Sequence, residues 1–145
     1  MLARDIHFIQ VGKDSKDHPA LHGATDAVGQ TGLRILFNLV RRCRGVVCGV
    51  SLLMHVAAAL GKPAIVIAGG REPVAWNSYP SQQYLHTVGA LPCTDPQGRS
   101  GACWRSMVAA LGDGAIFDND LCLYPLNCTP TPEPPTPMCM NMISP

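Results

Sequence analysis

The sequence predicts an α/β fold in which a parallel sheet is covered by helices on both faces. Three apolar runs, at residues 6–11, 46–50 and 64–68, have the length and the β-branched composition of buried strands. Segments with helical periodicity separate these runs, and the connections between them are short. Strands that alternate with helices in this way are joined by right-handed crossovers and therefore lie parallel in one sheet.

The first strand ends at Gly12, and the polar segment 13–30 that follows is expected to be irregular. A helix is predicted from Thr31, which can cap it, through Arg44. Its apolar residues recur at helical spacing and form one stripe: Leu33, Leu36, Phe37, Val40 and Cys43.

A second, buried helix is predicted over residues 52–60. Ser51 stands at its N-cap position, and Gly61 followed by Pro63 ends it in the usual way. Its small alanines let the helix backbone lie close to a sheet. The strand 64–68 comes directly after this helix, which completes a strand–helix–strand unit.

The pattern weakens beyond residue 70. A loop is predicted over residues 71–83, a short strand over 84–88 and a modest helix over 104–111. The last 21 residues contain seven prolines, which favours extended chain. We therefore expect one α/β domain over residues 1–120 and a Pro/Cys-rich tail over 121–145.

Composition excludes several classes of protein. The 11 Lys plus Arg nearly balance the 10 Asp plus Glu, so no basic field exists to bind nucleic acid. Charged residues within positions 1–12 interrupt any secretory signal, which predicts a cytoplasmic protein. Gly61 and Pro63 break the apolar stretch 45–70, so no transmembrane segment is expected.

Two places qualify as a binding site, because ligands of open parallel sheets bind beyond the carboxyl ends of the strands. At the start of the second helix, Ser51 and unpaired N–H groups could receive a phosphate or diphosphate. His55, one helical turn further on, either donates to a phosphate oxygen or is a buried residue bonded to a carbonyl. Gly69 and Gly70 either permit close ligand approach or simply make a turn.

The run VVCGVSLLMHVAAALGKPAIVIAGG, with TGLRILFNLVRRCRG upstream, resembles the nucleotide-sugar-binding half of glycosyltransferase family 9, the ADP-heptose:lipopolysaccharide heptosyltransferases and their relatives. The most specific element is HVAAALGKP, residues 55–63. In that family Asp-Ser/Thr-Gly precedes this element. Here Ser51 matches the hydroxyl position, whereas Val50 and Leu52 replace the Asp and the Gly. WNSYPSQQYLHTVGALPC, GACWRS and CMNMI resemble a cysteine-bearing branch of the same family.

The resemblance implies a GT-B glycosyltransferase, built from two Rossmann-like domains, of which this chain corresponds to a fragment of the C-terminal half. Residues 1–120 would then be a nucleotide-sugar-binding Rossmann-like domain that is incomplete at its start. It implies an ADP-sugar donor, a glycan or protein acceptor reached through the other domain, and a catalytic aspartate in that other domain. No cofactor is required for transfer. The expected location is cytoplasmic, with a peripheral position at the inner membrane face as an alternative. The nucleotide-sugar-binding residues would be Gly12, Ser51, Leu52, His55, Gly69 and Gly70.

The seven cysteines are an odd number in a chain without an export signal, which argues against a complete disulfide framework. Four of them could hold structural zinc or iron, although no CxxC pair supports this, and free cysteines acting as small apolar residues are the alternative. A rival function follows, in which the chain is a non-catalytic remnant or binding module with a metal site. The candidate ligands are Cys93, Cys103, Cys122 and Cys139.

Overall fold

The computed structural model describes residues 6–13, 19–70, 72–91, 125–126 and 136–143. The chain divides into two compact units, Met1–Cys43 and Arg44–Pro145, and each is described by itself. The predicted domain boundary at residue 120 and the predicted helix 104–111 lie outside the described residues. No helix in the described ranges combines the length and the apolar character needed to span a membrane.

Unit 1 begins with two short parallel strands, β1 (Phe8–Gln10) and β2 (Ala24–Asp26). The strand β2 falls in the segment that was expected to be irregular, so that prediction was wrong there. Its polar sequence carries no strand pattern. The Gln10 side chain fixes the intervening loop instead, because its Nε2 donates to the Pro19 carbonyl at 2.8 Å and its Oε1 accepts from the Leu21 N–H at 2.8 Å.

The helix α1 (Leu33–Arg42) closes unit 1 and is shorter than predicted. Gly32, not Thr31, is its N-cap residue, and no side chain caps it. Val40 is buried, whereas Leu33 and Phe37 are 61% and 44% exposed, so the buried stripe is narrower than the sequence indicated. The half-buried members of that stripe are Leu36 and Cys43.

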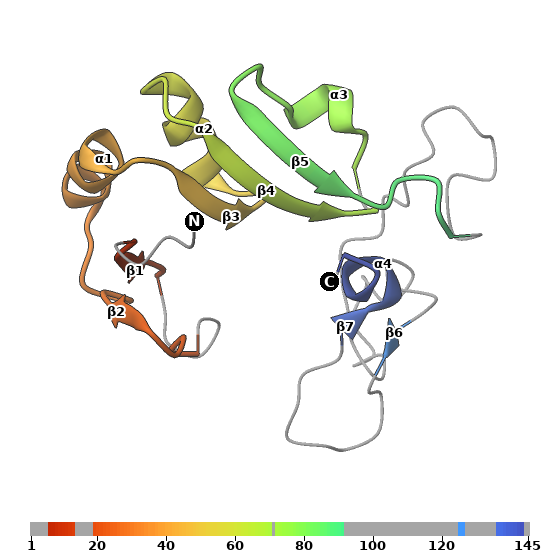
Figure 1. The fold of residues 1–145 in the computed structure, drawn as a ribbon, viewed down its shortest axis with the longest axis horizontal. Helices are drawn as coiled ribbons and strands as arrows, with labels where there is room; N and C mark the ends of the chain where they lie inside the picture. The colour runs from red at the N-terminus through yellow and green to blue at the C-terminus, as the bar shows by residue number, and fades with distance from the viewer. Residues whose placement is uncertain (1–5, 14–18, 71, 92–124, 127–135, 144–145) are drawn as a thin grey trace, which may run out of the picture. The chain divides into compact units, whose positions relative to one another are not determined.

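Unit 2 contains the parallel sheet, with strand order β3 (Val46–Gly49), β4 (Ala64–Gly69) and β5 (Gln82–His86). The helices α2 (Leu52–Ala59) and α3 (Val74–Asn77) make the two crossovers and lie on one side of the sheet (Figure 1). The parallel α/β fold is thereby confirmed.

The opposite face of this sheet carries Val47 and Ile65, which are 55% and 39% exposed. Within unit 2, the two crossover helices α2 and α3 cover the other face. The strand β5 also starts two residues before the predicted position, and α3 lies in a segment that was predicted to be a loop.

The helix α2 has the ends that the sequence predicts. Ser51 is its N-cap residue, with φ −159° and ψ 176°. At the other end Gly61 has φ +65°, its N–H donates to the Ala58 carbonyl at 3.0 Å, and the Lys62 N–H donates to the Ala57 carbonyl at 2.8 Å. This pair of bonds is a Schellman motif, which needs a residue without a Cβ at the left-handed position.

The core of unit 2 lies between α2 and the sheet. Met54, Ala57 and Val66 are 0% exposed. The strand β5 is tied to α2 by two side chains: Gln82 Nε2 donates to the Met54 carbonyl at 2.8 Å, and the Tyr84 hydroxyl lies 3.2 Å from Met54 Sδ. These contacts hold α2 firmly on the sheet and so fix the position of its N-terminus.

The C-terminal segment contains the antiparallel pair β6 (Pro125–Leu126) and β7 (Thr136–Pro137), followed by α4 (Met138–Asn141). The sequence predicted an extended tail here. The helical turn α4 instead contacts β4. The hydroxyl of Thr87, the residue after β5, donates to the Cys139 carbonyl at 2.8 Å and holds this turn at the sheet edge.

Candidate functional site

The start of α2 is open to solvent at the carboxyl end of β3. Val50 and Leu52 are 38% and 53% exposed, and Ser51 is exposed as well. The Ser51 hydroxyl makes no capping bond. Because the first N–H groups of a helix have no intrahelical acceptor, those of Leu52 and Leu53 are available to an incoming anion together with this hydroxyl.

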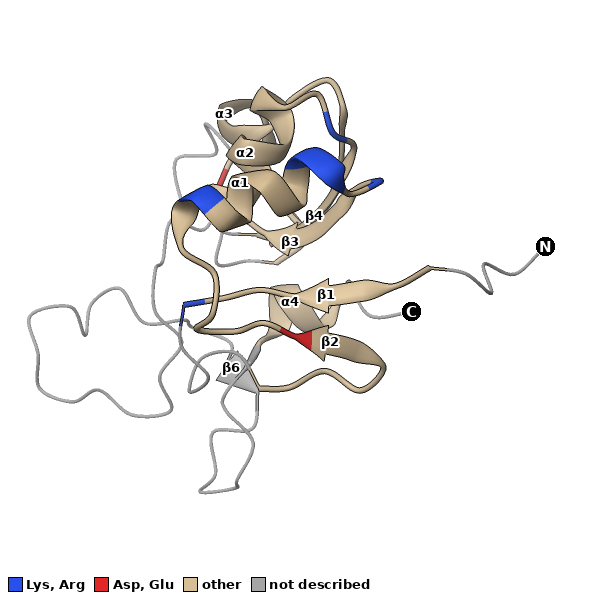
Figure 2. Cartoon of the chain, turned by 90° about the vertical axis from the view of Figure 1, so that its left-hand side faces the viewer, with Lys and Arg blue, Asp and Glu red and all other residues tan. Residues whose placement is uncertain are grey.

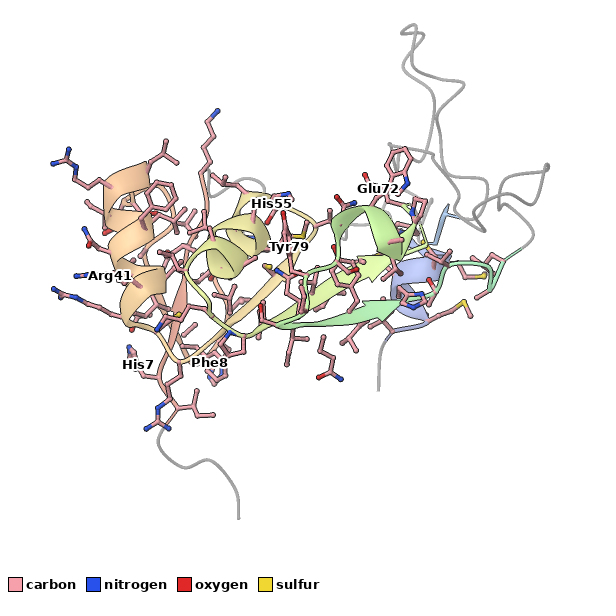
Figure 3. All side chains as sticks on the ribbon, turned by 90° about the horizontal axis from the view of Figure 1, so that it is seen from above. His7, Phe8, Arg41, His55, Glu72 and Tyr79 are labelled. Atoms are coloured by element: carbon pink, nitrogen blue, oxygen red, sulfur yellow. The ribbon has the colours of Figure 1, made fainter. Side chains whose placement is uncertain are left out.

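His55 is exposed rather than turned into the apolar interior. Its Nδ1 lies 2.8 Å from the hydroxyl oxygen of Tyr79, and the two rings meet edge to face, with centroids 5.7 Å apart and planes at 89° (Figure 3). Among the described residues this hydroxyl is the one hydrogen-bond partner of His55, so its Nε2 is available to a ligand.

The sequence presents Tyr79 only as an aromatic residue that could stack on a base or sugar or pack beside the core. The hydrogen bond to His55 joins residues 24 positions apart, on α2 and on the turn before β5. No spacing rule links such positions, and only the crossover through β4 and α3 brings them together.

The helices and strands around the start of α2 carry no charged side chain, and the described connections between them contain Lys62 and Glu72. The strands β3, β4 and β5 and the helices α2 and α3 contain no Asp, Glu, Lys or Arg (Figure 2). An anion at Ser51 would therefore be held by backbone N–H groups, the hydroxyl and the imidazole, with the helix dipole adding to the attraction.

Two groups near the sheet have raised pKa values. Burial raises the pKa of the Cys48 thiol, and burial together with the negative charge of Glu72 raises the pKa of the Tyr84 hydroxyl. Asn77 Nδ2 donates to the Glu72 carboxylate. Because Cys48 and Tyr84 stay protonated at neutral pH, neither adds a negative charge that would repel a diphosphate.

Gly69 and Gly70, at the end of β4, are buried. Gly69 has φ +63°, and a Cβ built there would lie 2.6 Å from the Met140 Sδ of α4. A Cβ on Gly70 would lie 3.3 Å from the Cys139 Cβ. Gly69 therefore makes a left-handed turn, and the helical turn α4 of the same chain packs closely against both glycines.

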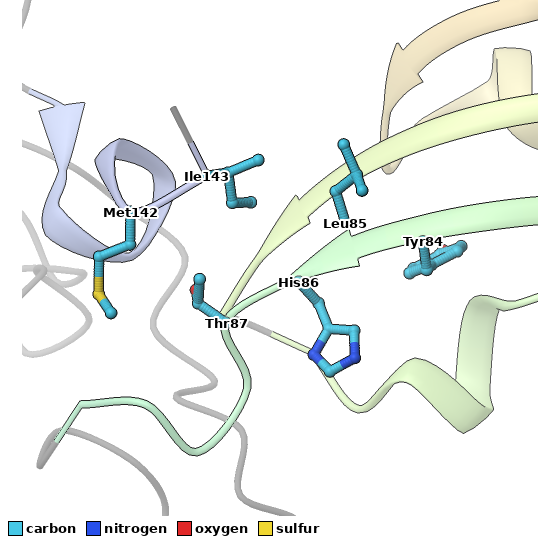
Figure 4. Close-up of a pocket in the computed structure, with 6 residues that line it drawn as sticks. All are labelled: Tyr84, Leu85, His86, Thr87, Met142 and Ile143. Atoms are coloured by element: carbon cyan, nitrogen blue, oxygen red, sulfur yellow. The ribbon is translucent and has the colours of Figure 1, made fainter. Parts of the chain in front are cut away.

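A shallow pocket of about 330 Å³ lies beyond the carboxyl end of β5 (Figure 4). No motif in the sequence points to the residues that line it, which come from the end of β5 and from the segment after α4. Leu85, Met142 and Ile143 make it partly apolar, with His86 and Thr87 as polar members and Tyr84 completing the lining.

The other predicted site residues are Gly12 and the four candidate cysteines. Gly12 follows β1 in unit 1, where its carbonyl accepts from the Gly29 N–H at 2.9 Å.

Among the predicted metal ligands, Cys139 is a free, half-buried thiol, while Cys93, Cys103 and Cys122 lie outside the described residues. The described part of the chain holds no group of three or more residues that could bind a metal ion. The zinc or iron site stays a prediction.

A parallel α/β unit with an open helix start beyond one of its strands is the arrangement by which many nucleotide-binding proteins receive phosphate groups. The sequence matches the family model of glycosyltransferase family 9 (heptosyltransferase) over residues 14–101, more than half of the chain. The chain belongs to this glycosyltransferase family. No curated protein and no solved structure matches it.

Proposed function

We propose that this chain is the donor-binding part of a glycosyltransferase that moves a sugar, a heptose, from an ADP-sugar to a hydroxyl group of a glycan or protein. Membership of family 9 supports the reaction class and a nucleotide-sugar donor. The observation that carries the donor site is the exposed pair of Ser51 and His55 at the open start of α2.

In the proposed reaction the acceptor oxygen bonds to the anomeric carbon while the bond from that carbon to the diphosphate oxygen breaks. The electron pair leaves with the nucleoside diphosphate, which gains negative charge in the transition state. The N–H groups at the start of α2, the Ser51 hydroxyl and the His55 imidazole stabilise this charge because they are already oriented before the reaction. The acceptor proton passes to a base, which the family resemblance assigns to an aspartate of the other domain.

The other proposed donor contacts are backbone positions. In unit 2, Gly69 ends β4, Gly70 follows it, and Leu52 offers the first N–H group of α2. In unit 1, Gly12 lies just beyond the carboxyl end of β1, and its donor contact is proposed separately. A donor group that reaches Gly69 and Gly70 on the side now covered by Met140 and Cys139 requires α4 to move away.

Binding rather than turnover is the proposed activity of these 145 residues, because the resemblance assigns the catalytic aspartate to the other domain. Transfer to lipopolysaccharide, at a cytoplasmic location on the inner membrane face, belongs to the same proposal.

Replacement of His55 by alanine is expected to weaken ADP binding about tenfold, the usual effect of removing one hydrogen bond to a charged group. Isothermal titration calorimetry with ADP and with an ADP-sugar measures this. His22→Ala is the matched control, because His22 is also an exposed histidine but lies in the loop of unit 1. Equal affinities for wild type and His55→Ala would contradict the role of His55, and absence of binding by either ligand would contradict the donor site.

The rival function, a non-catalytic binding module, is favoured by one feature of the same site. Val50 and Leu52 are apolar and exposed beside Ser51, where the family has an acidic residue and a glycine. Failure to bind ADP or ADP-sugar in the same titration would support this rival. Elemental analysis of protein purified under reducing conditions tests its metal site, and less than one equivalent of zinc or iron would count against it.

A further inference from the structure

We propose that Tyr79 is a positioning residue that holds His55 in the tautomer with the proton on Nε2, so that this nitrogen can donate to the diphosphate of the donor. The proposal rests on the donor-binding function above, and it deepens that function by adding a residue that acts through His55. The juxtaposition that carries it is the 2.8 Å contact between His55 Nδ1 and the Tyr79 hydroxyl oxygen.

The chemistry of the two groups assigns the proton. A neutral imidazole has one nitrogen that donates a hydrogen bond and one that accepts. A hydrogen bond that requires one nitrogen to accept therefore leaves the proton on the other nitrogen, which becomes the donor. A phenol O–H is a good donor, and within the described part of the chain Nδ1 is its one acceptor. When the phenol donates to Nδ1, the imidazole proton is on Nε2. A donor nitrogen is what a phosphate oxygen requires.

The contact between the His55 and Tyr79 rings also fixes the orientation of the imidazole. Edge-to-face packing at 5.7 Å limits rotation of the imidazole about its bond to Cβ. A histidine on an exposed helix surface would otherwise sample several rotamers, and ligand binding would have to select one of them. Fixing the ring in advance reduces that cost, which is the general advantage of preorganised donors.

Tyr79 can impose this orientation because its own backbone is anchored. The Ser78 N–H donates to the Val74 carbonyl at 2.9 Å, which ends α3, and the Gln82 N–H donates to the Tyr79 carbonyl at 2.9 Å, which leads into β5. The phenol therefore projects from a fixed turn between two elements of the sheet unit, rather than from a free loop.

The test is the protonation state of the imidazole nitrogens, read from long-range 1H–15N NMR correlations of 15N-histidine-labelled protein without ligand. Wild type is expected to show His55 with the proton on Nε2 and a hydrogen-bonded, unprotonated Nδ1. Tyr79→Phe keeps the ring and removes the hydroxyl, so it is expected to show a mixture of both tautomers. Tyr84→Phe removes a hydroxyl that contacts Met54 instead, and it is expected to leave the His55 signals unchanged.

Calorimetry with ADP gives the second readout. Tyr79→Phe is expected to weaken binding about three- to tenfold, as loss of one neutral hydrogen bond does. The same change in the His55→Ala background is expected to have no further effect, because Tyr79 acts through the imidazole. Additive losses in the double variant would overturn the proposal.

The two readouts separate this inference from the function on which it rests. A wild-type protein with the His55 proton on Nδ1, or a Tyr79→Phe variant with unchanged tautomers, would overturn the role of Tyr79 whatever ADP does. If the tautomers respond as expected and ADP does not bind any variant, the donor-binding function fails, while the control of the tautomer by Tyr79 stands.

Discussion

Replacing Met54 by alanine is expected to lower the free energy of unfolding by about 3 kcal/mol, within the range found when large buried side chains are truncated. Met54 is 0% exposed between α2 and the sheet, and its sulfur accepts from the Tyr84 hydroxyl at 3.2 Å. Truncation removes its buried apolar surface, leaves a cavity and leaves that hydroxyl without its partner. Chemical denaturation followed by circular dichroism measures the loss.

Leu60→Ala is the matched control for this experiment. Leu60 is the C-cap residue of the same helix, but it is 38% exposed, so its truncation is expected to cost about 1 kcal/mol or less. Similar losses for the two variants would show that Met54 does not lie in the core, and the described packing of α2 on the sheet would then be wrong.

Replacing Gly69 by alanine is expected to destabilise the protein by about 2 kcal/mol. The backbone there has φ +63°, which an L-residue with a Cβ adopts at a cost of about 1–2 kcal/mol. The new Cβ would also lie 2.6 Å from Met140 Sδ, so α4 must shift. Denaturation curves measure the total loss.

Gly61→Ala separates these two causes, because Gly61 has φ +65° but no atom lies within 4 Å of a Cβ built there. Its loss is expected to reflect the backbone alone and to be smaller than that of Gly69→Ala. In a Met140→Ala background the excess at Gly69 should disappear. An equal loss at both glycines would contradict the contact between α4 and the end of β4.

The sequence predicts the centre of the fold well where its signals are local. The strand at 46–50, the cap at Ser51 and the ending at Gly61 each follow from adjacent residues, and the structure confirms them. The strand β2 was not predicted because its sequence, Ala-Thr-Asp, carries no strand pattern. It forms by pairing with β1, and the Gln10 side chain holds the loop between the two strands through a bond to the Leu21 N–H, eleven residues away.

The candidate site shows the same division. The place of Ser51 at the start of a helix beyond a strand follows from the sequence, whereas for His55 the sequence leaves both a ligand contact and a buried position open, and the structure shows it exposed. The partner of His55 and the cover over Gly69 and Gly70 do not follow from the sequence, because both depend on contacts distant in sequence. Tyr79 is 24 residues from His55, and Cys139 is 52 residues from Thr87. Periodicity and capping rules act over a few residues and carry no information at such separations.

Binding of ADP at the start of α2 is tested most directly by a titration of 15N-labelled protein with ADP, followed by two-dimensional 1H–15N NMR. If the diphosphate binds at the start of α2, the largest shifts will fall on the amides of Ser51, Leu52 and Leu53 and on the imidazole of His55. Saturation with ADP that moves none of these signals, or that moves only residues remote from α2, would contradict a donor site at this helix start.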